Sequence, residues 1–171
     1  YDLLIAILIF IKLLHSFYKN HKSNQFSIIM VIGFIITGLI GVIFEFLGTE
    51  YGYWEYHDVA HQVPRWLFFA WGGAFITIYQ IETQIYNDIH NLSKKKKKLL
   101  TLIMAIILPA LGEMIAINLG TWTYYYPYKI FGVPLAAIVV LTTIHYSLHS
   151  ALSFISKKLN VEDLVFNPTK K

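Results

Sequence analysis

Two glutamates occur inside apolar stretches of the sequence, each just ahead of an aromatic segment. Glu45 begins the segment EFLGTEYGYWEY, and Glu113 begins the segment EMIAINLGTWTY. Each glutamate is followed by a Gly after seven residues, a Trp after nine and a Tyr after eleven. A carboxyl group in an apolar environment favours its neutral form, so it can hold a proton for delivery to a substrate. The pattern therefore predicts acid chemistry beside aromatic rings.

Glu113 is the stronger of the two acid candidates. It lies about seven residues before Gly120, which is ~10 Å along a helix, and a charge at that depth in a membrane is functional by default. Small residues share the helical face of each glutamate, which predicts a groove open to a neighbouring helix or ligand. These are Gly38, Gly41 and Gly48 for Glu45, and Pro109, Ala116 and Gly120 for Glu113. Glu45 could instead be an interfacial residue in water, or a partner of Arg65.

His145 and His149 are four residues apart, so they project from one face of a helix. Two histidines at this spacing can bind one metal ion, although no further carboxylate or His completes a known metal motif around them. The alternative is hydrogen bonding to a polar stripe on the span 66–86, formed by Gly73, Thr77, Gln80 and Gln84. We favour the hydrogen-bonding interpretation and expect no cofactor.

The two glutamate segments indicate an internal repeat. Their matched positions are offset by 68 residues, and a Val-Pro pair follows each segment, at Val63-Pro64 and Val133-Pro134. Repeats of this kind fix the architecture of a chain. Both copies run in the same direction, which predicts two helical hairpins related by a pseudo-twofold axis along the membrane normal.

Composition indicates an integral membrane protein that carries these segments. Of the 171 residues, 56% are hydrophobic and only 14% are charged, and the absence of cysteine excludes disulfides and thiolate chemistry. Five apolar segments approach the ~20 residues that a bilayer-spanning helix needs. They are residues 3–18, 26–47, 66–86, 99–119 and 133–155. We therefore predict an all-α polytopic membrane protein with about five transmembrane helices and two parallel hairpin repeats.

We expect the chain to form a single membrane domain over residues 1–171. Within it we assign 3–18 to an extra helix, 26–86 to the first repeat, 99–155 to the second repeat and 156–171 to a cytoplasmic tail. The N-terminal segment lacks the basic region and cleavage site of a signal peptide.

Basic residues predict the orientation of the chain. Eleven of the 14 basic residues fall on one side: Lys19, Lys22, Lys94–Lys98, Lys157, Lys158, Lys170 and Lys171. By the positive-inside rule this side is cytoplasmic, and the lysine run 94–98 is a solvated loop rather than a nucleic-acid site. All four tryptophans lie towards the other face, either as an interfacial belt or as the lining of a site.

A family resemblance follows from the pattern Glu-x-x-Gly-x-x-x-Gly-x-Trp-x-Tyr with a later Val-Pro and Trp. The pattern resembles carotenoid-biosynthesis membrane proteins of the bisanhydrobacterioruberin hydratase type and, more distantly, the small lycopene cyclases. The residues that carry the resemblance span about 35–140. They are Glu45, Gly48, Gly52, Tyr53, Tyr56, Pro64 and Trp71 in the first copy, and Glu113, Gly120, Trp122, Tyr124, Gly132, Val133 and Pro134 in the second.

The resemblance and the residues together predict an enzyme that protonates an alkene of a long apolar isoprenoid, followed by hydration or cyclisation. Glu113 would be the general acid and Glu45 a second acid or base. Aromatic faces stabilise cations, so Trp54, Trp122 and Tyr124 would form the wall of the site, with Tyr56 and Trp71 binding substrate. The expected partners are the lipid bilayer and an apolar small molecule.

Two other functions stay open at this point. A small transporter or binding subunit would use a polar path through the bundle, formed by Lys12, His15, Gln80, Glu82, Glu113 and His145. A metal-dependent membrane enzyme would need His145 and His149 to converge with a further carboxylate or His.

Overall fold

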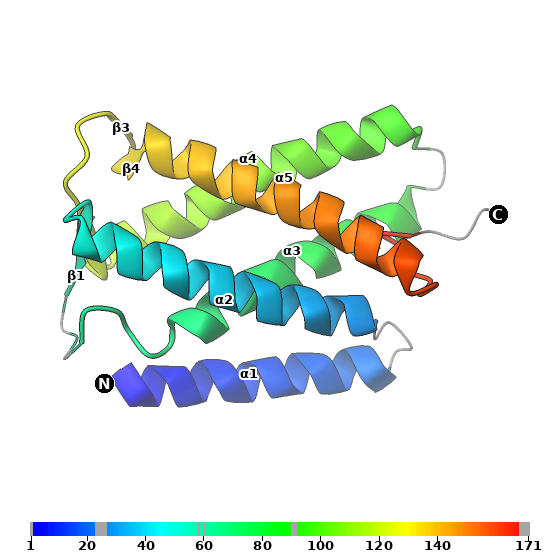
Figure 1. Ribbon diagram of the computed structural model, residues 1–171, viewed down its shortest axis with the longest axis horizontal. Coiled ribbons are helices and arrows are strands. Elements are labelled where there is room, and N and C mark those ends of the chain that lie inside the picture. The colour runs from blue at the N-terminus through cyan, green and yellow to red at the C-terminus, as the bar shows by residue number, and fades with distance from the viewer. Residues whose placement is uncertain (1, 23–26, 58, 60, 90–91, 168–171) are drawn as a thin grey trace. The chain divides into compact units, whose positions relative to one another are not determined.

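The computed structural model describes residues 2–22, 27–57, 59, 61–89 and 92–167. These residues form five helices and four short strands (Figure 1). The chain divides into two compact units. Unit 1 contains Tyr1–Ile76 and Thr121–Tyr125, and unit 2 contains Thr77–Gly120 and Tyr126–Lys171.

Helices make up most of the described chain. They are α1 (Asp2–Lys22), α2 (Ile28–Glu50), α3 (Leu67–Asp88), α4 (Lys94–Asn118) and α5 (Leu135–Lys158). The strands are β1 (Trp54–Tyr56), β2 (Trp122–Tyr124), β3 (Lys129–Ile130) and β4 (Val133–Pro134). Each helix covers one of the five predicted apolar segments. The predicted positions Phe26, Lys170 and Lys171 lie outside the described residues.

Three helices in the described part of the chain, α2, α4 and α5, are long and apolar enough to cross a membrane. This fits an all-α membrane protein. The helices α1 and α3 are not among the three, and both contain polar residues, such as Lys12 in α1 and Glu82 in α3.

The lysine run does not form the predicted loop. Helix α4 begins at Lys94, so the five lysines make up its first turns. The hydroxyl of Ser93 accepts a hydrogen bond from the backbone N–H of Lys96 (3.4 Å) and caps the helix. Positive charges are unfavourable at the start of a helix. Here the capping serine and the apolar residues that follow the lysines extend the helix through the run, so the loop prediction was wrong.

Unit 1 is held together by a close approach between α2 and the start of α3. A Cβ atom on Gly38 would lie 2.7 Å from the Phe68 ring, and a Cβ on Gly72 would lie 2.4 Å from the Phe34 ring. The two glycines thus each admit a phenylalanine of the other helix. The Phe34 and Phe68 rings also meet edge to face, with centroids 5.5 Å apart.

Unit 2 pairs α4 with α5 and ends in a C-terminal hook, residues 159–167. Asp163 is buried, and its carboxylate accepts hydrogen bonds from the Tyr79 hydroxyl and from the backbone N–H groups of Val165 and Phe166. The Phe166 ring stacks on the Tyr79 ring, and the Ser153 hydroxyl donates to the Phe166 carbonyl. The hook is therefore anchored to both α3 and α5.

The helix ends, the strands β1 and β2 and the following helix starts lie at corresponding positions after Glu45 and after Glu113, although β3 and β4 have no counterpart among the described residues after β1. Helix α2 ends at Glu50 and α4 at Asn118, and the glycines that follow, Gly52 and Gly120, have φ of 68° and 71°. Only glycine adopts this left-handed conformation without strain. Strand β1 then begins at Trp54 and β2 at Trp122, and α3 and α5 begin at Leu67 and Leu135.

Candidate functional site

Glu45 lies on α2 of unit 1, and its carboxylate accepts hydrogen bonds from three aromatic side chains. Trp54 Nε1 donates to Oε2 at 2.8 Å, and the Tyr56 hydroxyl donates to the same oxygen at 2.7 Å. Trp71 Nε1 donates to Oε1 at 3.0 Å. The glutamate is only 8% exposed. Three segments, α2, β1 and α3, therefore converge on one buried carboxylate.

The glycines beside Glu45 leave space on their face of α2, and indole rings occupy this space. A Cβ atom on Gly41 would lie 2.1 Å from Trp71 Cγ, and a Cβ on Gly48 would lie 1.8 Å from Trp54 Cη2. Real Cβ atoms do not approach other atoms this closely. The sequence predicted a groove open to a neighbouring helix or ligand, whereas the two tryptophans that bind Glu45 fill this face.

Pairing of β1 with β2 supplies the remaining aromatic side chains. The antiparallel register places Trp54 opposite Tyr124, and Tyr56 opposite Trp122. The first pair has ring centroids 5.5 Å apart at 64°, and the second has centroids 5.4 Å apart at 66°. The edge of the Tyr56 ring also meets Trp66, with centroids 6.1 Å apart.

The three side chains bound to Glu45 act as hydrogen-bond donors to its carboxyl oxygens. An indole N–H can donate but cannot accept, so Trp54 and Trp71 each need an acceptor oxygen on Glu45. Arg65, the alternative partner for Glu45, instead contacts Asp2 and His61. Glu45 is therefore bound by the neutral donors Trp54, Tyr56 and Trp71.

Trp122 contributes an unused donor to this site. Its Nε1 atom is buried and makes no hydrogen bond to any residue in the described ranges. A buried donor in this state calls for an explanation, since most buried polar groups are paired. An acceptor atom of a bound molecule would satisfy it.

His57 and His61 have hydrogen-bond partners other than Glu45. His57 Nε2 lies 2.8 Å from the Thr123 hydroxyl, and His61 Nε2 lies 2.8 Å from Arg65 Nη2. The first contact fastens β1 to β2 beside the site, and the second is in the exposed connection to α3.

The predicted site residues are divided between the two units. Unit 1 brings together Glu45 and five aromatic residues: Trp54, Tyr56, Trp71, Trp122 and Tyr124. Glu113 is on α4 of unit 2, where it is half-buried, four residues after Pro109. His145 and His149 are on α5 of unit 2.

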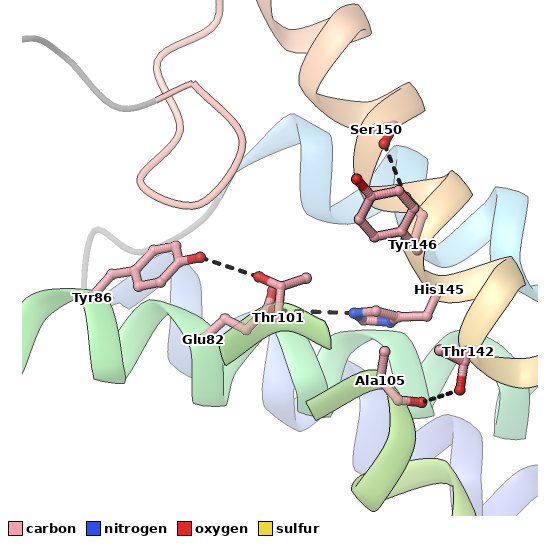
Figure 2. Close-up of polar contacts among 8 residues, drawn as sticks. All are labelled: Glu82, Tyr86, Thr101, Ala105, Thr142, His145, Tyr146 and Ser150. Carbon is pink, nitrogen blue, oxygen red and sulfur yellow. Dashed lines mark hydrogen bonds and ion pairs between the residues drawn. The ribbon is translucent and has the colours of Figure 1, made fainter. Parts of the chain in front are cut away.

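The two histidines of α5 have different neighbours. His145 Nε2 lies 3.8 Å from Glu82 Oε1 (Figure 2), and the Glu82 side chain is buried while that of His145 is 10% exposed. The His149 ring packs on Phe166 of the C-terminal hook, with centroids 5.0 Å apart. The described residues contain no group of three metal-binding side chains. The partner of His145 is thus a polar residue of α3 outside the predicted stripe.

Sequence reasoning named Glu82 only as part of a transport path and did not pair it with His145. The available signal was a carboxyl group in the middle of an apolar segment that also carries Thr77 and Gln80. Sequence reasoning also missed Asp163. The segment 156–171 was assigned to a cytoplasmic tail, and nothing in its sequence indicates that this carboxylate is buried.

Comparisons with protein-family models, with curated proteins and with solved structures found no match to this chain. The resemblance to carotenoid-biosynthesis membrane proteins therefore stays a prediction. The chemistry of the residues around Glu45 carries the functional argument.

Proposed function

We propose that the protein is a membrane-embedded enzyme that acts on a long apolar isoprenoid of the carotenoid type by acid-triggered alkene protonation. The observation that carries this proposal is the buried Glu45 carboxylate, bound by Trp54, Tyr56 and Trp71 next to Trp122 and Tyr124. Carbocation chemistry needs a carboxyl group, exclusion of water and aromatic side chains that stabilise positive charge. Around Glu45, unit 1 combines a buried carboxyl group with aromatic side chains, and unit 2 carries the second carboxyl group, Glu113.

The same proposal includes the internal repeat. The end of the first helix, the left-handed glycine, the strand and the start of the second helix recur at a spacing of 68 residues. The β1–β2 register supports it too, because Trp54 and Trp122 are matched positions and each pairs with the tyrosine of the other copy. We propose two parallel hairpins preceded by α1, with five helices crossing the bilayer, lysine-rich ends in the cytoplasm and both strands at the outer face.

In the proposed reaction Glu113 is the general acid. Its O–H bond breaks as a C–H bond forms at the terminal alkene carbon, which leaves a tertiary carbocation and a carboxylate. In hydration, a water oxygen then bonds to the cation and releases one proton; in cyclisation, an internal alkene attacks and a neighbouring C–H releases the proton. Glu45 is proposed as a second acid or base, because three donors hold its carboxyl group in place.

Expression in cells that make an acyclic carotenoid tests this function. We expect a new pigment, one water heavier per hydrated end or equal in mass if cyclised, measured by chromatography with mass spectrometry. Glu113→Gln should abolish the product, since an amide cannot donate a proton of comparable acidity. Glu45→Gln should lower it strongly.

Glu50→Gln is the matched control, because Glu50 is the exposed last residue of the helix that carries Glu45. Its carboxylate accepts a hydrogen bond from the side chain of Gln62. This variant should give as much product as the wild type. Unchanged pigments with correctly inserted wild-type protein would rule the proposed reaction out.

A further inference from the structure

Unit 2 contains a buried carboxyl–imidazole pair that the proposed reaction does not use. Glu82 projects from α3 and His145 from α5, and the two side chains point toward one another (Figure 2). The distance from Glu82 Oε1 to His145 Nε2 is 3.8 Å. The Glu82 side chain is 2% exposed and the His145 side chain is 10% exposed. Both titratable groups are therefore almost entirely shielded from solvent.

The pair has unused hydrogen-bonding capacity. At 3.8 Å the contact is too long for a hydrogen bond, and neither Glu82 Oε1 nor His145 Nε2 makes a hydrogen bond to another described residue. A buried ion pair repays its desolvation only when further hydrogen bonds satisfy both partners. As a purely structural tie between α3 and α5, this arrangement is poor.

Neighbouring ionisable groups are engaged elsewhere. On α3, the Tyr86 hydroxyl lies 3.3 Å from Thr101 Oγ1 of α4. The ammonium of Lys97, also on α4, sits 4.8 Å from the centre of the Tyr86 ring. On α5, His149 packs on the C-terminal hook, and within the hook Asp163 binds Tyr79. Among the described ion pairs, the partner of Glu82 is therefore His145.

We propose that Glu82 and His145 form a proton-exchange site within unit 2. The two groups share one proton, which passes from the carboxyl oxygen to the imidazole nitrogen as an O–H bond breaks and an N–H bond forms. The reverse step regenerates the neutral pair, so the exchange needs no other reactant. Bringing the two atoms about 1 Å closer gives a charge-assisted hydrogen bond of ~2.8 Å. The site takes a proton as its ligand, and its donor and acceptor come from different helices.

The pair should titrate as one coupled unit. Two ionisable groups that interact strongly release their protons in steps that belong to the pair rather than to either residue. Replacement of one partner must therefore change the behaviour of the other.

Infrared difference spectroscopy of the purified protein during a pH titration tests the site. In the wild type, the carboxyl band of Glu82 and a ring band of His145, marked with nitrogen-15 histidine, should change together. Glu82→Gln should remove the carboxyl band and move the midpoint of the His145 band by about one pH unit or more. His145→Gln should move the midpoint of the Glu82 band by a similar amount.

Two controls separate coupling from general effects of substitution. Glu162→Gln removes an exposed carboxyl group of the hook, and His149→Gln removes the next imidazole along α5. Both should leave the two midpoints in place. If one single variant does not fold, the other measures the same coupling from the opposite partner, and the double variant Glu82→Gln/His145→Gln should lose both bands. Bands that are absent, or that titrate independently, would overturn the proposal.

Discussion

Substitution of Gly48 by alanine should disrupt the hydrogen bonding at Glu45 without changing the glutamate itself. The new Cβ atom would lie 1.8 Å from Trp54 Cη2 and 2.0 Å from Trp54 Cζ2. Ordinary contact begins at about 3.4 Å, so the indole must move away from α2. Its Nε1 now donates to Glu45 at 2.8 Å, and a shift of this size breaks the bond.

The expected loss follows from three contributions. Forcing extra atoms into a packed site costs about 1–3 kcal/mol, and leaving a buried hydrogen-bonding group without its partner costs about 1–3 kcal/mol. The higher helix propensity of alanine offsets up to about 1 kcal/mol of this destabilisation. Because the first two contributions overlap, we expect Gly48→Ala to lower the free energy of unfolding by about 2–4 kcal/mol.

Gly112→Ala on α4 is the matched control, because a Cβ atom there meets nothing within 4 Å. It should raise stability by about 0.5–1 kcal/mol. Denaturant unfolding in detergent, followed by tryptophan emission and by circular dichroism, measures both variants. If Gly48→Ala were as stable as Gly112→Ala, the close packing of Trp54 on α2 would be refuted.

Three further substitutions have defined outcomes. Glu45→Gln should lower the free energy of unfolding by about 1–3 kcal/mol, since the amide nitrogen cannot accept a hydrogen bond; an unchanged denaturation midpoint would contradict this. The Glu55 carboxylate accepts a hydrogen bond from Tyr125 and raises the pKa of that phenol. The resulting stabilisation is present below pH ~10 and is lost as pH rises through the raised pKa. Glu55→Gln should therefore lower the Tyr125 pKa in an ultraviolet titration referenced to Tyr125→Phe, and an unmoved curve would count against the contact. Asp163→Asn should speed hydrogen exchange over residues 161–167 by weakening the bond to Tyr79, whereas unaltered exchange would show that the hook holds without it.

The helices could be predicted from the sequence because apolar runs of sufficient length have few other conformations in a membrane protein. The face shared by Gly41, Glu45 and Gly48 also follows from helical periodicity alone. The residues that fill this face could not be derived in the same way. Trp54 and Trp71 reach Glu45 only because a left-handed turn at Gly52 and the rotation of α3 direct them there.

Contacts between distant segments account for the rest of what sequence reasoning missed. The pairing of β1 with β2 joins residues far apart in the chain, and two three-residue strands carry no periodicity from which to infer a register. The Glu82–His145 contact depends on the rotation of two helices relative to each other. The lysine run 94–98 was assigned to a loop from its charge, whereas Ser93 caps a helix that includes it.

The source of the hydrogen added to the substrate tests the central claim most directly. Membranes that contain the protein are supplied with an acyclic carotenoid in deuterated water, and the product is analysed by mass spectrometry and deuterium NMR. Alkene protonation by an exchangeable carboxyl group predicts one carbon-bound deuterium per converted end, at the former terminal alkene carbon, and no product with Glu113→Gln. A product without carbon-bound deuterium, or one formed equally by Glu113→Gln, would contradict acid-triggered chemistry by Glu113.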